Sequence, residues 1–396
     1  MLALALTAAL ALGGPGTLDR SFGGDGRVVT PTRVAPSVAG IESLPGGRTL
    51  LVGTIGPRRL VLLRYRADGS IAKRSSVPFD RDMAAHDTLL DSRGRLLVAG
   101  TLGDDALLLR FNRTGHLDPT FDRDGIAAVD FGGRDDAAAL AVARGGSILL
   151  AAEVNVDDGS RMGVTRVSSA GVVDRRFGTQ GFAFEGPDGV HYDHDTPRSI
   201  AVESNGVIDV GHDIRGVEGA VGLLTRLTAN GEPDESLPMT RGEYGDVSAL
   251  AVRPRAGQLL VAGADPTASG RNRPWVAAVN AAAPRIGWQT FVPIRGYAAW
   301  SSSLALDSGG RAVVGGIISY GNAAVDRLVA RFRRDGRLDR CFGRRGVARV
   351  FFKSWSYGTA LTIDGRGRIV IAGPTGVAEE RTPRQFELAR LRGGDC

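Results

Sequence analysis

The sequence predicts an all-β fold, a seven-bladed β-propeller built from four-stranded antiparallel blades. Two observations support this prediction. An apolar run that ends in a small residue recurs seven times, at spacings of 47 to 59 residues. Turns containing glycine separate the runs, and glycine makes up 56 of the 396 residues. Four short strands in a unit of about 50 residues are typical of a propeller blade.

Each repeat contains the same elements in the same order. The first is a short apolar segment, such as SALAV at 248–252, which leads into a turn such as SRGR at 92–95. The second strand is the recurrent run, such as LLVAGT at 96–101, and a variable loop joins it to a third run, such as ALLLRFN at 106–112. A looser fourth strand follows, such as GIAAVDF at 125–131. The small residues that end the seven recurrent runs are Gly53, Gly100, Ala152, Gly211, Gly263, Gly316 and Gly373.

A sharper motif joins the third and fourth strands. An arginine, a turn glycine, an aspartate, an aromatic residue and a second glycine keep fixed offsets. The three clear copies are Arg110, Gly115, Asp118, Phe121 and Gly125; Arg166, Gly171, Asp174, Phe177 and Gly181; and Arg331, Gly336, Asp339, Phe342 and Gly346. This motif resembles the delta-60 repeat family, a bacterial propeller-type repeat without a defined common activity. The resemblance covers residues 16–396 and implies a propeller found mostly in exported or surface proteins.

Some repeats depart from this motif. Repeat one has Ala72 where the aspartate is expected, and repeat four has Leu237 and Arg241 at the aromatic and glycine positions. Repeat five has Val279 and Gly287 at the arginine and aspartate positions, so both charges are lost together. This joint loss indicates that the two charges form a physical pair, because an arginine between two blades is largely desolvated and needs a carboxylate. The expected ion pairs are Arg110–Asp118, Arg166–Asp174, Arg226–Asp234 and Arg331–Asp339.

The two ends of the chain are predicted to complete the last blade together. The last repeat stops after its third strand, and residues 16–30 carry the motif that this repeat lacks. We expect Gly26–Thr30 to pair with Phe386–Arg392, and Asp19 to supply the carboxylate for Arg390. The sequence leaves open whether Cys341 and Cys396, at the same end of neighbouring blades, form a disulfide.

Residues 1–13 are interpreted as a signal-peptide-like leader, and residues 14–396 as a single propeller domain. The first twelve residues are apolar and uncharged, which indicates a secreted or cell-surface protein. They are too few for a transmembrane span, which needs about 20 residues. The net charge of +6 is spread over all repeats without a long basic run, which argues against nucleic-acid binding. We expect a monomer.

The sequence shows no nucleophile elbow, phosphate-binding loop, dinucleotide fingerprint or zinc spacing, so no cofactor is predicted and an enzyme is disfavoured. A local polar group consists of His191, Asp193 and His194, with His212 further along. In a four-stranded meander the links between blades and the loops between strands two and three open on one face. These four side chains could therefore bind a divalent metal. A solvated polar loop is the alternative.

Aromatic residues gather on the same predicted face. The links between blades contain Tyr192, Tyr244, Tyr297, Trp300, Trp355 and Tyr357. Such rings can bind a glycan or a peptide, although rings that plug the central channel would give the same pattern. The sequence favours an exported, non-catalytic binding or scaffold module for a glycan or protein partner. The alternatives are an exported propeller hydrolase or lyase with a His/Asp or metal site on blade four, and a purely structural surface repeat protein.

Overall fold

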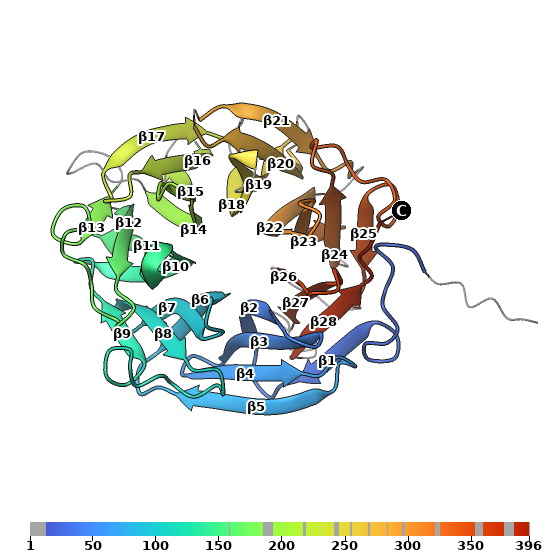
Figure 1. Ribbon diagram of the computed structural model, residues 1–396, viewed down its shortest axis with the longest axis horizontal. Coiled ribbons are helices and arrows are strands. Elements are labelled where there is room, and N and C mark those ends of the chain that lie inside the picture. Colours follow the sequence, from blue (N-terminus) through green and yellow to red (C-terminus); the bar gives the residue numbers. More distant parts are fainter. Residues whose placement is uncertain are drawn as a thin grey trace, which may run out of the picture.

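A computed structural model shows seven four-stranded antiparallel sheets arranged around a central axis (Figure 1). The predicted seven-bladed propeller is therefore confirmed. The structure describes residues 13–157, 159–184, 193–216, 219–240, 245–253, 256–267, 270–282, 284–294, 298–320, 325–352, 359–375 and 384–395. A 3₁₀ turn lies at Arg144–Gly146. No helix in the described part of the chain is long and apolar enough to cross a membrane.

In blades one to six the strands run in sequence order from the channel to the outside. Blade one comprises β2 (Pro36–Leu44), β3 (Arg48–Ile55), β4 (Arg59–Tyr65) and β5 (Ile71–Pro78), and blade two β6 (Met83–Leu90), β7 (Leu96–Leu102), β8 (Asp105–Phe111) and β9 (Ile126–Val129). Blade three comprises β10 (Arg134–Val142), β11 (Ile148–Val156), β12 (Gly159–Val167) and β13 (Phe182–Phe184), and blade four β14 (His194–Val202), β15 (Ile208–Gly216), β16 (Gly219–Leu227) and β17 (Pro233–Pro238).

The remaining blades follow the same plan. Blade five comprises β18 (Asp246–Arg253), β19 (Gln258–Pro266), β20 (Asn272–Asn280) and β21 (Ile286–Phe291), and blade six β22 (Ala298–Leu306), β23 (Ala312–Ser319), β24 (Val325–Phe332) and β25 (Val347–Val350). Blade seven comprises β26 (Ala360–Ile363), β27 (Ile369–Thr375) and β28 (Gln385–Leu391), with β1 (Arg27–Pro31) as its outer strand.

The N-terminal strand closes the ring as predicted. β1 pairs with β28 in antiparallel register, with Thr30 opposite Phe386. Asp19 supplies the expected carboxylate, because its Oδ2 lies 2.8 Å from Nε of the buried Arg390. The leader prediction concerns residues 1–13, of which the first twelve lie outside the described residues.

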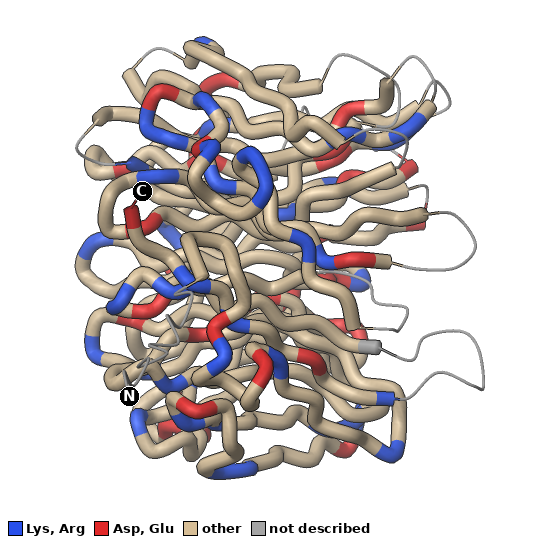
Figure 2. The backbone as a smooth tube through the Cα atoms, turned by 90° about the vertical axis from the view of Figure 1, so that its right-hand side faces the viewer, with Lys and Arg blue, Asp and Glu red and all other residues tan. Residues whose placement is uncertain are grey.

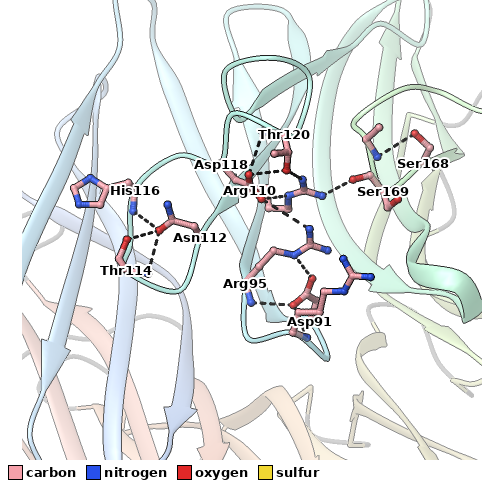
Figure 3. A network of polar contacts seen from close by, with 12 residues as sticks. Asp91, Arg95, Arg110, Asn112, Thr114, His116, Asp118, Thr120, Ser168 and Ser169 are labelled. Carbon is pink, nitrogen blue, oxygen red and sulfur yellow. Dashed lines mark hydrogen bonds and ion pairs between the residues drawn. The ribbon is translucent and has the colours of Figure 1, made fainter.

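Three of the four ion pairs expected within blades are confirmed. Asp118, Asp174 and Asp339 each lie 2.8 Å from the arginine eight residues before them. Figure 3 shows the first pair, in which the Arg110 guanidinium contacts Asp118 and also reaches Ser169 of blade three. The motif aromatic completes the arrangement, because Arg110 Cζ lies 4.6 Å from the ring centre of Phe121. The motif arginines therefore connect neighbouring blades as well as bracing their own.

The predicted pair between Arg226 and Asp234 is wrong. Asp234 is exposed at the start of β17, whereas Arg226 lies 2.8 Å from Glu203 and 3.1 Å from Asp209. Repeat four lacks the motif turn, so β17 continues directly along β16 with Glu235 opposite Arg226. Two acids of the same blade, Glu203 in the turn after β14 and Asp209 in β15, then occupy the place of the missing aspartate.

The inner strands of six blades share a β-bulge that shapes the channel. The register shifts once in each, for example between Ala85 and Asp87 in β6. The bulged residues are Ala39, His86, Ala138, Arg198, Ser248 and Ser302, and all six line the central channel. Next to the bulge, a Cβ added to Gly100 would lie 1.9 Å from the carbonyl oxygen of Ala84, so the second strand needs glycine there.

Candidate functional site at the mouth of the channel

A cavity of about 850 Å³ opens where the inner strands begin, and we call it the mouth cavity. It joins the channel, because both are lined by the bulged residues His86 and Arg198. Gly216 and Gly219, which flank the turn between β15 and β16, line it together with Trp300 at the start of β22. Links between blades and loops between strands two and three therefore open on one face, as the topology requires.

Four residues that line the mouth cavity occupy the same position in successive blades. In four successive blades the residue two places before the bulge lines it: Asp136, Thr196, Asp246 and Trp300. Strand positions with paired backbones hold side chains in fixed directions, which suits a preorganised site. The mouth therefore presents two carboxyl groups, a hydroxyl group and an indole from a rigid frame.

An imidazole–carboxylate pair lies at the side of blades two and three. His86 Nε2 is 3.0 Å from Asp136 Oδ1, and Thr101 Oγ1 donates a hydrogen bond of 2.7 Å to the same oxygen. Burial alone would raise the pKa of Asp136, but the hydrogen bond and the charge of His86 hold it below its ordinary value. Both side chains stay accessible, with 37% of His86 and 46% of Asp136 exposed.

A second charged group lies at the side of blades four and five. Arg198 Nε is 2.9 Å from Asp213 Oδ2, while Asp213 Oδ1 accepts a hydrogen bond of 2.9 Å from the Val247 backbone. Burial, together with the nearby charge of Asp213, raises the pKa of Asp246 to about 7. Asp246 is therefore partly protonated at neutral pH and can both donate and accept hydrogen bonds.

Two further carboxyl groups line the channel below the mouth. Glu42 accepts a hydrogen bond of 2.8 Å from Thr88 Oγ1, and burial raises its pKa to about 8. Asp87 accepts a hydrogen bond of 2.9 Å from the Leu140 backbone of the next blade, and burial raises its pKa to about 6. The channel therefore takes up or releases protons across the neutral range.

Of the six aromatic residues predicted to form a ligand face, Trp300 is half-buried and lines the mouth cavity. The other five, Tyr192, Tyr244, Tyr297, Trp355 and Tyr357, lie outside the described residues. The prediction of an aromatic face therefore rests on one ring in the part of the chain that the structure describes.

The two described histidines of the predicted metal group, His194 and His212, differ in exposure and in their contacts. His194 is 60% exposed and lies 3.4 Å from Glu153, while Asp193 is exposed beside it. His212 is completely buried. Within the described ranges, no group of three or more His, Cys, Asp or Glu residues could hold a metal ion. His191 lies outside those ranges, and the metal hypothesis stays a prediction.

His212 belongs to a buried hydrogen-bond network. Its Nδ1 is 2.7 Å from Asp195 Oδ1, and its Nε2 is 2.9 Å from Thr225 Oγ1. Asp195 in turn accepts a hydrogen bond of 2.9 Å from the Met162 backbone of blade three. The order carboxylate, imidazole, hydroxyl is that of a catalytic triad, but none of the imidazole or carboxylate surface is exposed. The network therefore braces the seam between blades three and four.

The sequence did not reveal His86, Asp136, Arg198 and Asp246 as residues of the mouth cavity. A signal was present, because the first strands consist mainly of small and apolar residues, and among the six described bulges an ionisable side chain occurs in repeats two and four. The bulge cannot be recognised in the sequence. A regular strand, in which side chains alternate between the two faces, would direct His86 and Arg198 away from the central axis.

Comparisons with known proteins show the fold. A family described as a β-propeller domain of unknown function, DUF5122, matches residues 94–121. A search of curated proteins found no match.

Several solved structures are similar across most of the chain. A protein of unknown function from Dyadobacter fermentans shares 11% identity over 93% of this chain and 98% of its own, with a TM-score of 0.52. The polysaccharide lyase Uly1 shares 10% identity over 98% of this chain and 94% of its own, with a TM-score of 0.50. A puromycin-hydrolysing peptidase from Mycobacterium tuberculosis shares 12% identity over 96% of this chain and 55% of its own, also at 0.50.

Proposed function

We propose that this chain is an exported, non-catalytic binding protein that holds a glycan in the mouth cavity. The observation that carries the proposal is the shared lining of that cavity by the Trp300 indole, the Arg198 guanidinium and the Asp246 carboxyl. A sugar ring has apolar C–H faces and a rim of hydroxyl groups. An indole packs against such a face, while charged side chains accept and donate hydrogen bonds at the rim.

The size and the chemistry of the cavity support this proposal. Its volume of about 850 Å³ lies within the range of roughly 300 to 1,000 Å³ that small-ligand sites occupy. Asp136 acts as an acceptor, Arg198 as a donor, and Asp246 as either near neutral pH.

The resemblance of the motif to the delta-60 repeats supports export. Sequencing the N-terminus of secreted protein tests that part, and a product that retains residues 1–13 would contradict it.

A glycan array on the purified chain, followed by calorimetry with the tightest hit, tests the binding proposal. We expect Trp300→Ala to weaken binding by about 5- to 150-fold, because truncating an anchor costs about 1–3 kcal/mol, and Trp300→Phe to retain most of the affinity. Asp136→Asn, which removes a carboxylate of the cavity, should also weaken binding, and Asp25→Asn, which removes an exposed carboxylate of the N-terminal segment, is its matched control. The proposal fails if no glycan binds, or if Trp300→Ala binds the hit as tightly as the wild type.

An enzyme that uses the same cavity is the second candidate, and the pKa of about 7 for Asp246 favours it. A carboxyl group that titrates near neutral pH can serve as a general acid or base in hydrolysis or lyase chemistry. Product release from the array hits, followed by mass spectrometry, distinguishes the two functions. A catalytic role predicts that Asp246→Asn abolishes product release while binding persists. Binding without any product release supports the non-catalytic protein.

A further inference from the structure

A groove with a different chemistry lies on the outside of the ring, at the seam between blades five and six. It encloses about 1060 Å³ between Thr290 and Pro293 of blade five and the turn between β24 and β25 of blade six. Four arginines line it: Arg333, Arg337, Arg340 and Arg345. We call this feature the arginine groove. It shares no residue with the mouth cavity.

The degenerate motif of repeat five explains the groove. In blades two and three the motif turn covers the next blade, because Asp122 donates a backbone hydrogen bond of 2.8 Å to Ala170, and Gly178 one of 2.6 Å to Asn230. Blade five has no motif turn, since β20 ends at Asn280 and β21 begins at Ile286. The corresponding turn of blade six therefore lacks the backbone contact that a motif turn makes, and Trp288 of blade five packs against its Gly336 instead.

The positive charge in the groove is available to a ligand. Arg337, Arg340 and Arg345 are exposed, and none of them forms an ion pair within the described part of the chain. Arg333 lies 2.8 Å from Asp335, but half of each side chain is exposed. Figure 2 views the ring from the side of β24 and β25, and basic segments are visible there near the C-terminus.

The basic lining continues past the groove along the start of β25. A second cavity of about 710 Å³ shares Pro293 and Arg345 with the arginine groove and adds Arg344 and Arg349. The guanidinium groups are thus distributed along a strip rather than gathered at one point. A strip of this kind fits an extended ligand that carries several negative charges, not a single small anion.

We propose that the arginine groove binds an anionic polysaccharide, with carboxylate or sulfate groups repeated along the chain. Planar guanidinium groups form paired hydrogen bonds with such oxyanions. None of the described residues that line the two cavities is Phe, Tyr or Trp. Single-stranded nucleic acids depend on such rings for base stacking, so the lining favours a polysaccharide over nucleic acid.

The experiment compares two triple variants of the whole chain. Arg337→Gln, Arg340→Gln and Arg345→Gln together remove three charges from the groove. The matched control combines Arg123→Gln, Arg175→Gln and Arg176→Gln, which remove three exposed charges from the motif turns of blades two and three. Glutamine is compatible with the fold, because Gln180 occupies in blade three the position that Arg345 has in blade six, with φ of 56° at both. Equal melting temperatures establish that both variants are folded.

Calorimetry with oligogalacturonate, dextran sulfate and neutral dextran gives the readout. We expect the wild type to bind one or both anionic chains and not neutral dextran, and the two anionic probes distinguish carboxylate from sulfate. The groove variant should bind roughly tenfold more weakly, while the control should change by less than about twofold. Trp300→Ala should leave this binding unchanged, which separates the inference from the proposed function of the mouth.

Three results would overturn the proposal. One is that neither anionic chain binds. Another is that both triple variants weaken binding equally, which would assign the effect to net charge. The third is that duplex or single-stranded DNA binds more tightly than either polysaccharide, which would make the groove a nucleic-acid site.

Discussion

The Arg253 side chain of blade five donates a hydrogen bond of 3.2 Å to the backbone carbonyl of Arg334 in blade six. Elsewhere the third-strand arginine makes this contact, as when Arg166 donates to Ala229 of the next blade at 2.8 Å. Val279 stands at that position in repeat five, and Arg253 reaches the same kind of turn from the inner strand β18. The contact between the blades therefore persists although its usual residue is lost.

We expect Arg253→Ala to lower the free energy of unfolding by about 1–3 kcal/mol, because it leaves the carbonyls of Arg334 and Gly310 without their donor. Arg366→Gln, on an exposed turn, is the control and should change the stability by less than about 0.5 kcal/mol. Urea unfolding followed by circular dichroism measures both. Equal stabilities would show that Arg253 does not support the seam.

Closure of the ring should depend on Asp19. Asp19→Ala leaves the buried Arg390 without its carboxylate, so we expect a loss of about 3 kcal/mol. Burial would raise the pKa of Asp19, but Ser21 and Arg390 outweigh it and lower the pKa below the ordinary 3.8. The stabilisation is therefore present above about pH 4 and is lost as the pH falls through the lowered pKa. Hydrogen exchange should accelerate in β1 and β28 before the other blades.

Asp246 should make the stability depend on pH in the opposite sense. Its pKa rises from 3.8 to about 7 on folding, so its contribution is present below pH 4 and is lost as the pH rises through 7. We expect Asp246→Asn to melt at a higher temperature than the wild type at pH 8, and at a similar temperature at pH 4. Carbon-detected NMR of the carboxyl group should show a midpoint near 7, and a midpoint near 4 would contradict this assignment.

His212 should contribute to the stability of the fold rather than to metal binding. His212→Ala leaves the Asp195 carboxylate buried without the imidazole, and we expect a loss of about 3 kcal/mol. His194→Ala, at a largely exposed position, should change stability by less than about 0.5 kcal/mol. Thermal melts with and without added zinc complete the test. A zinc-dependent rise in melting temperature that His212→Ala abolishes would favour the metal hypothesis instead.

The fold was predictable because the same interactions recur in every repeat. The apolar second strand is fixed by packing between blades, and the bulge favours a small residue at its end, which is glycine in six repeats and Ala152 in the third. The pair between Asp19 and Arg390 followed from the offset of eight residues together with the copy of the motif in residues 16–30. Arg226 departs from that rule because its partners come from earlier in the blade, Glu203 from the turn after β14 and Asp209 from β15, and the spacing of the motif does not reveal them.

The candidate site was predictable only in part. Topology placed Trp300 on the face where the mouth cavity opens. His86 and Arg198 were missed, because a bulge changes the direction of a single side chain and leaves no mark in the hydrophobic pattern. Cys341 is disulfide-bonded, and the other cysteine of the chain, Cys396, lies outside the described residues.

The pairing of β1 with β28 also has a consequence for biosynthesis. A ribosome releases β1 before the other strands of the ring, and its partner β28 only after the six blades between them. Until then the strand presents an unsatisfied edge, which is a template for aggregation, and blade seven cannot form. A chain that terminates early therefore cannot close its ring, however well its first six blades fold. Closure therefore requires that synthesis reach β28, and a chaperone that shields β1 during synthesis would raise the yield of folded protein.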